Sequence, residues 1–178
     1  MPPANLDQLI QNLKSENVDV RYAAWRSAGP AGASAIVPIA ELMASTDKGM
    51  VRSATEALGR VAHHAARPTA SKNERRAVAQ ALIQVASAPR PRMVRGEALH
   101  QLGFVAEERN VSALARLLDD KEVREDARMA LERIPGTQSL RALEDALRRA
   151  PADFQPNLLQ AINNRRAMNA TTAAQAQR

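Results

Sequence analysis

The chain has 178 residues, a formal net charge of +6 and no cysteine, which excludes a disulfide framework and a thiolate metal site. No apolar stretch approaches the roughly 18 to 20 residues that a membrane-spanning helix needs, and the first ten residues lack the basic region and apolar run of a signal peptide. The sequence therefore predicts a soluble, cytoplasmic protein without membrane contact. Aromatic residues make up 2% of the chain, and Ala, Leu, Val, Ile and Met dominate its apolar content, which favours an all-α fold.

Five segments with apolar residues at helical spacing are expected to form the first helices of five helix pairs. In chain order they are residues 6–13, 36–43, 78–85, 114–118 and 140–147. Each precedes a copy of one recurring pattern, so the chain is expected to repeat a helix, a turn and a second helix.

The recurring pattern places an apolar residue, often followed by Arg, before an alanine, then a small residue, Leu and Gly. It is clearest in the segments VDVRYAAWRSAG, GMVRSATEALG and RMVRGEALHQLG. Its central residues are Ala24, Ala54, Ala98, Ala127 and Leu158, so three steps are close to 30 residues and the second is longer. The glycines that follow the first three copies, Gly29, Gly59 and Gly103, are expected to cap helix C-termini.

These copies, in register, resemble the second helices of the short HEAT-repeat family, whose repeats are roughly 30 residues long. The resemblance implies an α-solenoid of about five helix pairs, a HEAT/armadillo-like superhelix, over residues 1–166. The longer second step predicts an insertion loop near residues 63–73, and residues 167–178 are expected to form a flexible polar tail.

Second helices of such solenoids line a concave surface that binds a segment of another protein. The sequence therefore predicts a non-enzymatic protein–protein interaction module or scaffold. The repeat register places seven side chains near the concave face: Tyr22, Arg26, Arg52, Glu56, His100, Glu125 and Met129.

A basic segment at residues 60–95 supports an alternative, nucleic-acid binding as in HEAT-like DNA-binding proteins. This segment contains one acidic residue, Glu74, and eight cations. They are Arg60, Arg67, Lys72, Arg75, Arg76, Arg90, Arg92 and Arg95. The rest of the chain is close to neutral, and aromatic side chains for base stacking are scarce. A protein partner with an acidic patch is therefore the preferred interpretation.

Catalytic and metal-binding functions have no support from residue spacing. Deoxyhypusine hydroxylase, a HEAT-repeat enzyme, carries His-Glu pairs after the Val-Arg of its second helices, and no corresponding pair here contains His. His63 and His64 are neighbours, which point about 100° apart on a helix. We therefore expect that the protein binds no cofactor and no metal and is not an enzyme. A HEAT-like lyase or a HEAT-like glycosylase is the remaining enzymatic alternative. Trp25 is expected to fill space beside the first repeat's core.

Overall fold

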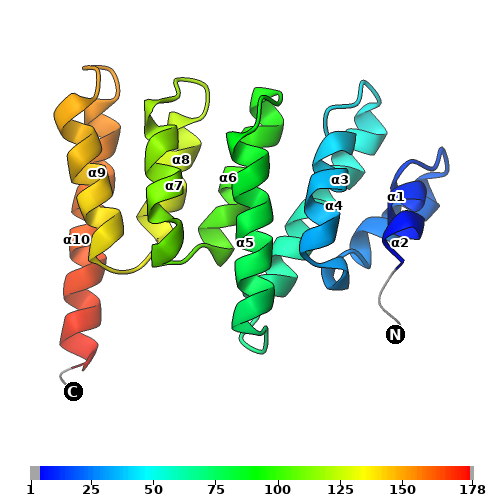
Figure 1. Ribbon diagram of the computed structural model, residues 1–178, viewed down its shortest axis with the longest axis horizontal. Helices are drawn as coiled ribbons and strands as arrows, with labels where there is room; N and C mark the ends of the chain where they lie inside the picture. Colours follow the sequence, from blue (N-terminus) through cyan, green and yellow to red (C-terminus); the bar gives the residue numbers. More distant parts are fainter. Residues whose placement is uncertain (1–4, 177–178) are drawn as a thin grey trace. The chain divides into compact units, whose positions relative to one another are not determined.

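The computed structural model describes residues 5–176, and within them the chain forms α-helices and short 3₁₀ helices without strands (Figure 1). The all-α prediction is confirmed. The ten α-helices are α1 (Leu6–Leu13), α2 (Val18–Arg26), α3 (Ile36–Leu42), α4 (Lys48–Ala66), α5 (Lys72–Ser87), α6 (Arg92–Val105), α7 (Val111–Arg116), α8 (Arg124–Arg133), α9 (Thr137–Arg149) and α10 (Gln155–Ala176). The 3₁₀ helices are η1 (Gly29–Ala31), η2 (Ala33–Ala35), η3 (Glu108–Asn110) and η4 (Leu117–Asp119).

Contacts between helices divide the chain into two units, and unit 1 ends at Val105. Within unit 1, α1 packs on α2, α3 on α4 and α5 on α6, while α4 also contacts α2 and α6, and α3 contacts α5. Ala54, Ala57 and Ala98 are fully buried, because the small side chain of the repeated alanine lets neighbouring helices approach closely. First helices thus form one layer and second helices the other, as in a helical-repeat solenoid.

Unit 2 begins at Ala106 and repeats this arrangement. Helix α7 packs on α8 and α9 on α10, while α8 contacts α10 and α7 contacts α9. Leu131, Phe154 and Leu158 are almost fully buried in its core. The predicted five helix pairs are therefore present, three in unit 1 and two in unit 2.

The expected glycine caps were wrong for all three copies of the repeat. Gly59 lies in the middle of α4, Gly103 lies within α6, and α2 already ends at Arg26, three residues before Gly29. At Gly59, a Cβ atom would lie 3.5 Å from Nε2 of Gln101. Gly59 therefore lies against the Gln101 side chain of α6 and not at a helix end, at a distance that a Cβ atom would also fill in ordinary van der Waals contact.

The extra residues of the second step lengthen two helices. Helix α4 has 19 residues and α5 has 16, whereas α3 has 7. Of the residues expected in an insertion loop, His63 to Ala66 continue α4, and Lys72 already begins α5. Residues 167–176 of the expected tail continue α10, and residues 1–4 and 177–178 lie outside the described residues.

Candidate partner-binding surface

A groove lies between α2 and α4, on the layer that the second helices of unit 1 form. Its volume is about 360 Å³, and its lining residues are Val18, Arg21, Tyr22, Trp25, Gly49, Arg52, Ser53 and Glu56. Tyr22 keeps 49% of its surface exposed, and Trp25 is half-buried. Two of the chain's few aromatic side chains therefore face solvent here, where a partner can contact them.

Arginines from two helices hold the aromatic rings of this groove in place. The Tyr22 and Trp25 rings meet edge to face with centroids 5.1 Å apart. The Arg26 guanidinium lies 5.4 Å from the Tyr22 centroid and donates a 2.9 Å hydrogen bond to its hydroxyl oxygen. Arg60 of α4 lies 5.2 Å from the Trp25 centroid. These cation–π contacts restrict the ring rotamers before any partner arrives.

Helix α4 carries three charged side chains at four-residue spacing, Arg52, Glu56 and Arg60, which places them on one face. Among the described residues, Arg52 and Glu56 make no hydrogen bond or ion pair. Both are exposed, so water satisfies them. A partner with complementary groups can therefore bind them without breaking an interaction inside the protein.

Two more hollows adjoin the groove. A pocket of about 330 Å³ between α4 and α6 is lined by Thr55, Glu56, Gly59, Arg60, His63, Glu97 and Gln101. A shallower one is lined by Arg26, Gly29, Pro30, Arg60, His63, His64 and Arg67. Glu56 lines both the groove and the pocket, and Arg60 and His63 line both the pocket and the shallower hollow. Together they form a continuous surface across α2, α4 and α6, which we call the unit 1 face.

On α6 the unit 1 face ends in another aromatic cluster. The Phe104 ring meets His63 of α4 edge to face at 4.8 Å and His100 of its own helix at 5.5 Å. Phe104 keeps 43% of its surface exposed. Each of the three second helices of unit 1 thus contributes an aromatic or imidazole ring to the face.

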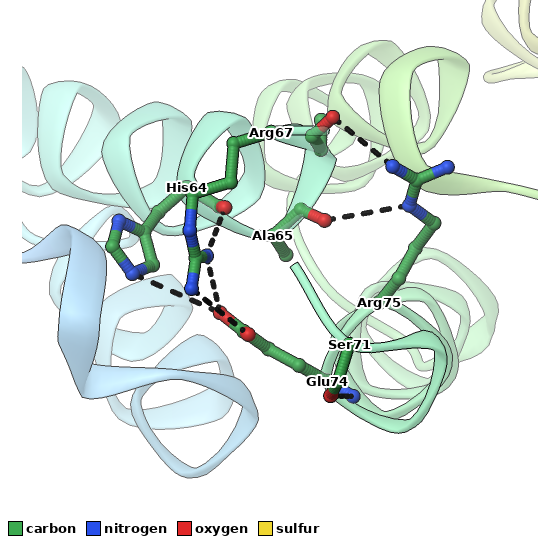
Figure 2. A network of polar contacts seen from close by, with 7 residues as sticks. His64, Ala65, Arg67, Ser71, Glu74 and Arg75 are labelled. Atoms are coloured by element: carbon green, nitrogen blue, oxygen red, sulfur yellow. Dashed lines mark hydrogen bonds and ion pairs between the residues drawn. The ribbon is translucent and has the colours of Figure 1, made fainter. Parts of the chain in front are cut away.

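At the corner between α4 and α5, two arginines of the predicted basic segment make structural hydrogen bonds (Figure 2). Arg67 donates to both carboxylate oxygens of Glu74, at 2.7 and 3.2 Å, and to the carbonyl of His64. Arg75 donates to the carbonyls of Ala65 and Ala66 at 3.4 and 3.1 Å. These bonds satisfy carbonyls at the C-terminus of α4.

The Arg67 hydrogen bonds lower the pKa of Glu74 below its ordinary value near 4.5, and the positive charges nearby act in the same direction. His64 also lies near this carboxylate, with Nε2 3.8 Å from Oε1. The Glu74 carboxylate therefore holds the start of α5 against the end of α4.

The remaining cations of the basic segment lie at several places in unit 1. Arg95 is buried, at 8% exposure, and donates a 2.8 Å hydrogen bond from Nε to the Ala86 carbonyl. Arg90 lies 3.9 Å from Glu41. Arg76 is half-buried on α5, and Lys72 and Arg92 are exposed at the first positions of α5 and α6. Only Arg60 and Arg67 contribute to the unit 1 face.

In unit 2, the charges on the second helices bind one another. Arg128 of α8 lies 2.9 Å from Glu125 and 2.7 Å from Glu132. From α10, Asn157 donates to Glu125, and Asn164 donates to Glu132 at 2.8 Å. Of the residues predicted here to bind a partner, Glu125 is engaged in this network, which we call the unit 2 ladder.

Met129, the other predicted residue of unit 2, keeps 40% of its surface exposed. It lines a hollow of about 350 Å³ with Arg128, Glu132, Arg133, Gln160, Asn164 and Met168. Most of these polar residues belong to the unit 2 ladder or adjoin it.

Five residues of the predicted partner-binding set lie on the unit 1 face or at its edge. Tyr22, Arg52 and Glu56 line the groove, Arg26 contacts Tyr22, and His100 contacts Phe104. Trp25, which was expected to fill space beside the first repeat's core, is half-buried and also lines the groove.

Arg60 and Phe104 were missed as members of this face. They stand four residues after Glu56 and His100, respectively. Extending each copy of the repeat by one helical turn would have indicated both of them.

Among residues 5–176 there is no cluster of three or more His, Cys, Asp or Glu side chains that could hold a metal ion. None of the described helices is long and apolar enough to cross a membrane.

No family model matches the chain, and no curated protein matches it. Several solved helical-repeat structures do. One is an engineered protein with 19% identity, a TM-score of 0.45, and coverage of 91% of this chain and 79% of the other. Another is a designed armadillo repeat protein in complex with the peptide (KR)4, with 19% identity, a TM-score of 0.45, and coverage of 90% and 82%.

A third solved structure is of computationally designed armadillo repeat proteins for modular peptide recognition. It has 17% identity, a TM-score of 0.45, and coverage of 88% of this chain and 80% of the other. Because all three identities are below 20%, these likenesses concern the helical-repeat fold alone.

Proposed function

We propose that this protein is a binding scaffold and that its unit 1 face holds an extended segment of another protein across α2, α4 and α6. The observation that carries the proposal is the groove between α2 and α4. It presents the half-buried Trp25 and the exposed Tyr22, both held by arginines, beside the unpaired charges of Arg52 and Glu56.

The composition of the unit 1 face supports this proposal. Tyr, Trp and Arg are the residues most enriched where truncation to alanine costs the most binding free energy. Their enrichment here contrasts with a chain in which aromatic residues make up only 2%. Because Arg26 and Arg60 already restrict the Tyr22 and Trp25 rings, less side-chain entropy is lost when a partner binds.

The charges of the face favour a protein over a polyanion as the partner. Glu56 and Glu97 lie among the arginines of the face, where carboxylates would repel phosphates. Several cations of the basic segment bind carbonyls or Glu74. Arg26 and Arg52 are suited to bind acidic side chains of a partner segment. These side chains would form the acidic patch that the sequence predicts on the partner.

A random library of 12-residue peptides displayed on phage tests the proposal directly. Peptides selected on the wild-type protein are synthesised with a fluorophore, and their dissociation constants are measured by anisotropy. We expect Trp25→Ala to weaken the selected peptides by at least about tenfold, since buried aromatic anchors contribute about 2 kcal/mol or more.

Two variants serve as matched controls. Gln80→Ala replaces an exposed residue of α5, and Met129→Ala replaces an exposed residue of unit 2; both should leave peptide affinity within about twofold. If no peptide is enriched, or if Trp25→Ala and Met129→Ala act alike, the proposal is wrong. Binding to random DNA or RNA that falls steeply with added salt would support phosphate recognition instead.

A further inference from the structure

We infer that the pocket between α4 and α6 receives a basic side chain, lysine or arginine, of the partner segment. This inference rests on the proposed function and adds the chemistry of one subsite on the unit 1 face. It starts from Gln101, a buried polar residue that lines the pocket.

Gln101 is only 5% exposed, and its carbonyl oxygen Oε1 is buried without a hydrogen-bond donor among the described residues. Its amide nitrogen Nε2 donates a 2.7 Å hydrogen bond to Oε1 of Glu97. This bond fixes the orientation of the amide, because a flipped amide would place two acceptor oxygens against each other. The side chain therefore holds an unsatisfied acceptor in a pocket wall, where buried polar groups normally have partners.

Two carboxylates line the same pocket. Glu56 makes no ion pair or hydrogen bond among the described residues, and Glu97 uses one oxygen to accept from Gln101. Gly59 of α4 also lines the pocket, and it has no side chain to cover the neighbouring Gln101 amide. Acceptors from two helices thus surround a space of about 330 Å³ without an internal donor for Gln101 Oε1.

The cationic and imidazole side chains at the rim are engaged by aromatic rings. Arg60 lies over the Trp25 ring at 5.2 Å, and His63 meets the Phe104 ring at 4.8 Å. Arg60 forms no ion pair with Glu56 within 4.0 Å. The unmet acceptors therefore favour a group that brings several N–H donors and a positive charge, which describes an ammonium or a guanidinium.

A titration with single amino-acid derivatives, followed by NMR at the Gln101 side-chain amide, tests this inference. The probes are Nα-acetyl-arginine methylamide, Nα-acetyl-lysine methylamide and the neutral citrulline derivative. We expect saturable shifts with the two cations, and at least about tenfold weaker binding of citrulline, since charge-assisted hydrogen bonds are lost. Comparison of the two cations decides whether the fork of arginine or the compact ammonium of lysine fits better.

Glu56→Gln and Glu97→Gln should each weaken the cation response by at least about tenfold. Glu56 is exposed, so its variant should fold, and Gln80→Ala should leave the response unchanged. Equal binding of arginine and citrulline, or no saturable shift with either cation, would overturn the inference.

The two proposals fail separately. Selected peptides that depend on Trp25 but not on Glu56 or Glu97 would leave the peptide surface standing without a basic subsite. A saturable arginine response without any peptide binding would reject the peptide surface and retain the cation pocket.

Discussion

The second helices of the two units share one repeat pattern but use their charged residues in opposite ways. In unit 2, Arg128 binds both Glu125 and Glu132, which in turn accept hydrogen bonds from Asn157 and Asn164. In unit 1, Arg52 and Glu56 at related positions of α4 have no such partners among the described residues. The first arrangement stabilises the fold, and the second presents charges to solvent.

The aromatic residues follow the same division. Tyr22, Trp25 and Phe104 lie on the unit 1 face, partly exposed, whereas Phe154 of unit 2 is buried at 1% exposure beneath Arg124. A partner binding at the unit 2 ladder would have to replace existing bonds, and a partner at the unit 1 face would not. The difference supports the proposal that unit 1 binds the partner, while the charges of α8 and α10 stabilise unit 2.

The cores of the units should be equivalent even though their faces differ. Leu58 and Leu131 are both fully buried. We expect Leu58→Ala and Leu131→Ala each to lower the free energy of unfolding by about 2 to 5 kcal/mol, through lost burial and a residual cavity. Urea denaturation followed by circular dichroism measures both; a cost below about 1 kcal/mol for either variant would show that its unit lacks a tightly packed core.

Removing one arginine from each unit tests the assignment of charges more sharply. Arg128→Met leaves the Glu125 and Glu132 carboxylates without their shared cation, so we expect a loss of about 1 to 2 kcal/mol in unfolding free energy. Arg52→Met should change stability by less than about 0.5 kcal/mol while weakening selected peptides. Equal stability losses in the two variants would contradict the contrast between the units.

The pH dependence of stability tests the ion pair between Arg67 and Glu74 at the corner between α4 and α5. The Arg67 hydrogen bonds lower the pKa of Glu74 in the folded state. Folding is therefore stabilised above the ordinary pKa near 4.5, and this stabilisation is lost as the pH falls through the lower, folded-state pKa.

We expect the wild-type protein to exceed Glu74→Gln in stability by about 1 kcal/mol near neutral pH, with the gap closing in acid. Denaturation curves of both proteins across that range measure it. A gap that stays constant, or widens, as the pH falls would show that the carboxylate does not stabilise the corner between α4 and α5.

The sequence predicted the helix pairs well because their signal is local. The small or apolar residue at the centre of each copy is buried where the second helix packs on its neighbours, and Ala54, Ala98 and Ala127 are all fully buried. The same register indicated Tyr22 and Glu56 on one face. Helix caps were predicted less well, since Gly59 lies in the middle of α4 and not at the end of its helix.

The parts of the face that depend on distant residues could not be predicted in this way. Arg60 and Trp25 are 35 positions apart, and only the packing of α2 on α4 brings the guanidinium to the ring. Arg95 belonged to a basic segment by composition, yet it is buried against the end of α5. The net charge of a segment does not reveal which of its arginines will donate hydrogen bonds to carbonyls at helix C-termini.

The most direct test of the unit 1 face is to map where a selected peptide binds. Backbone amide shifts of the ¹⁵N-labelled protein are recorded as the strongest peptide is added. We predict that the perturbed amides cluster on α2, α4 and α6, with saturation at one peptide per chain, and that α8 and α10 remain unchanged. Perturbations confined to α8 and α10 would contradict the assignment of unit 1 as the binding unit.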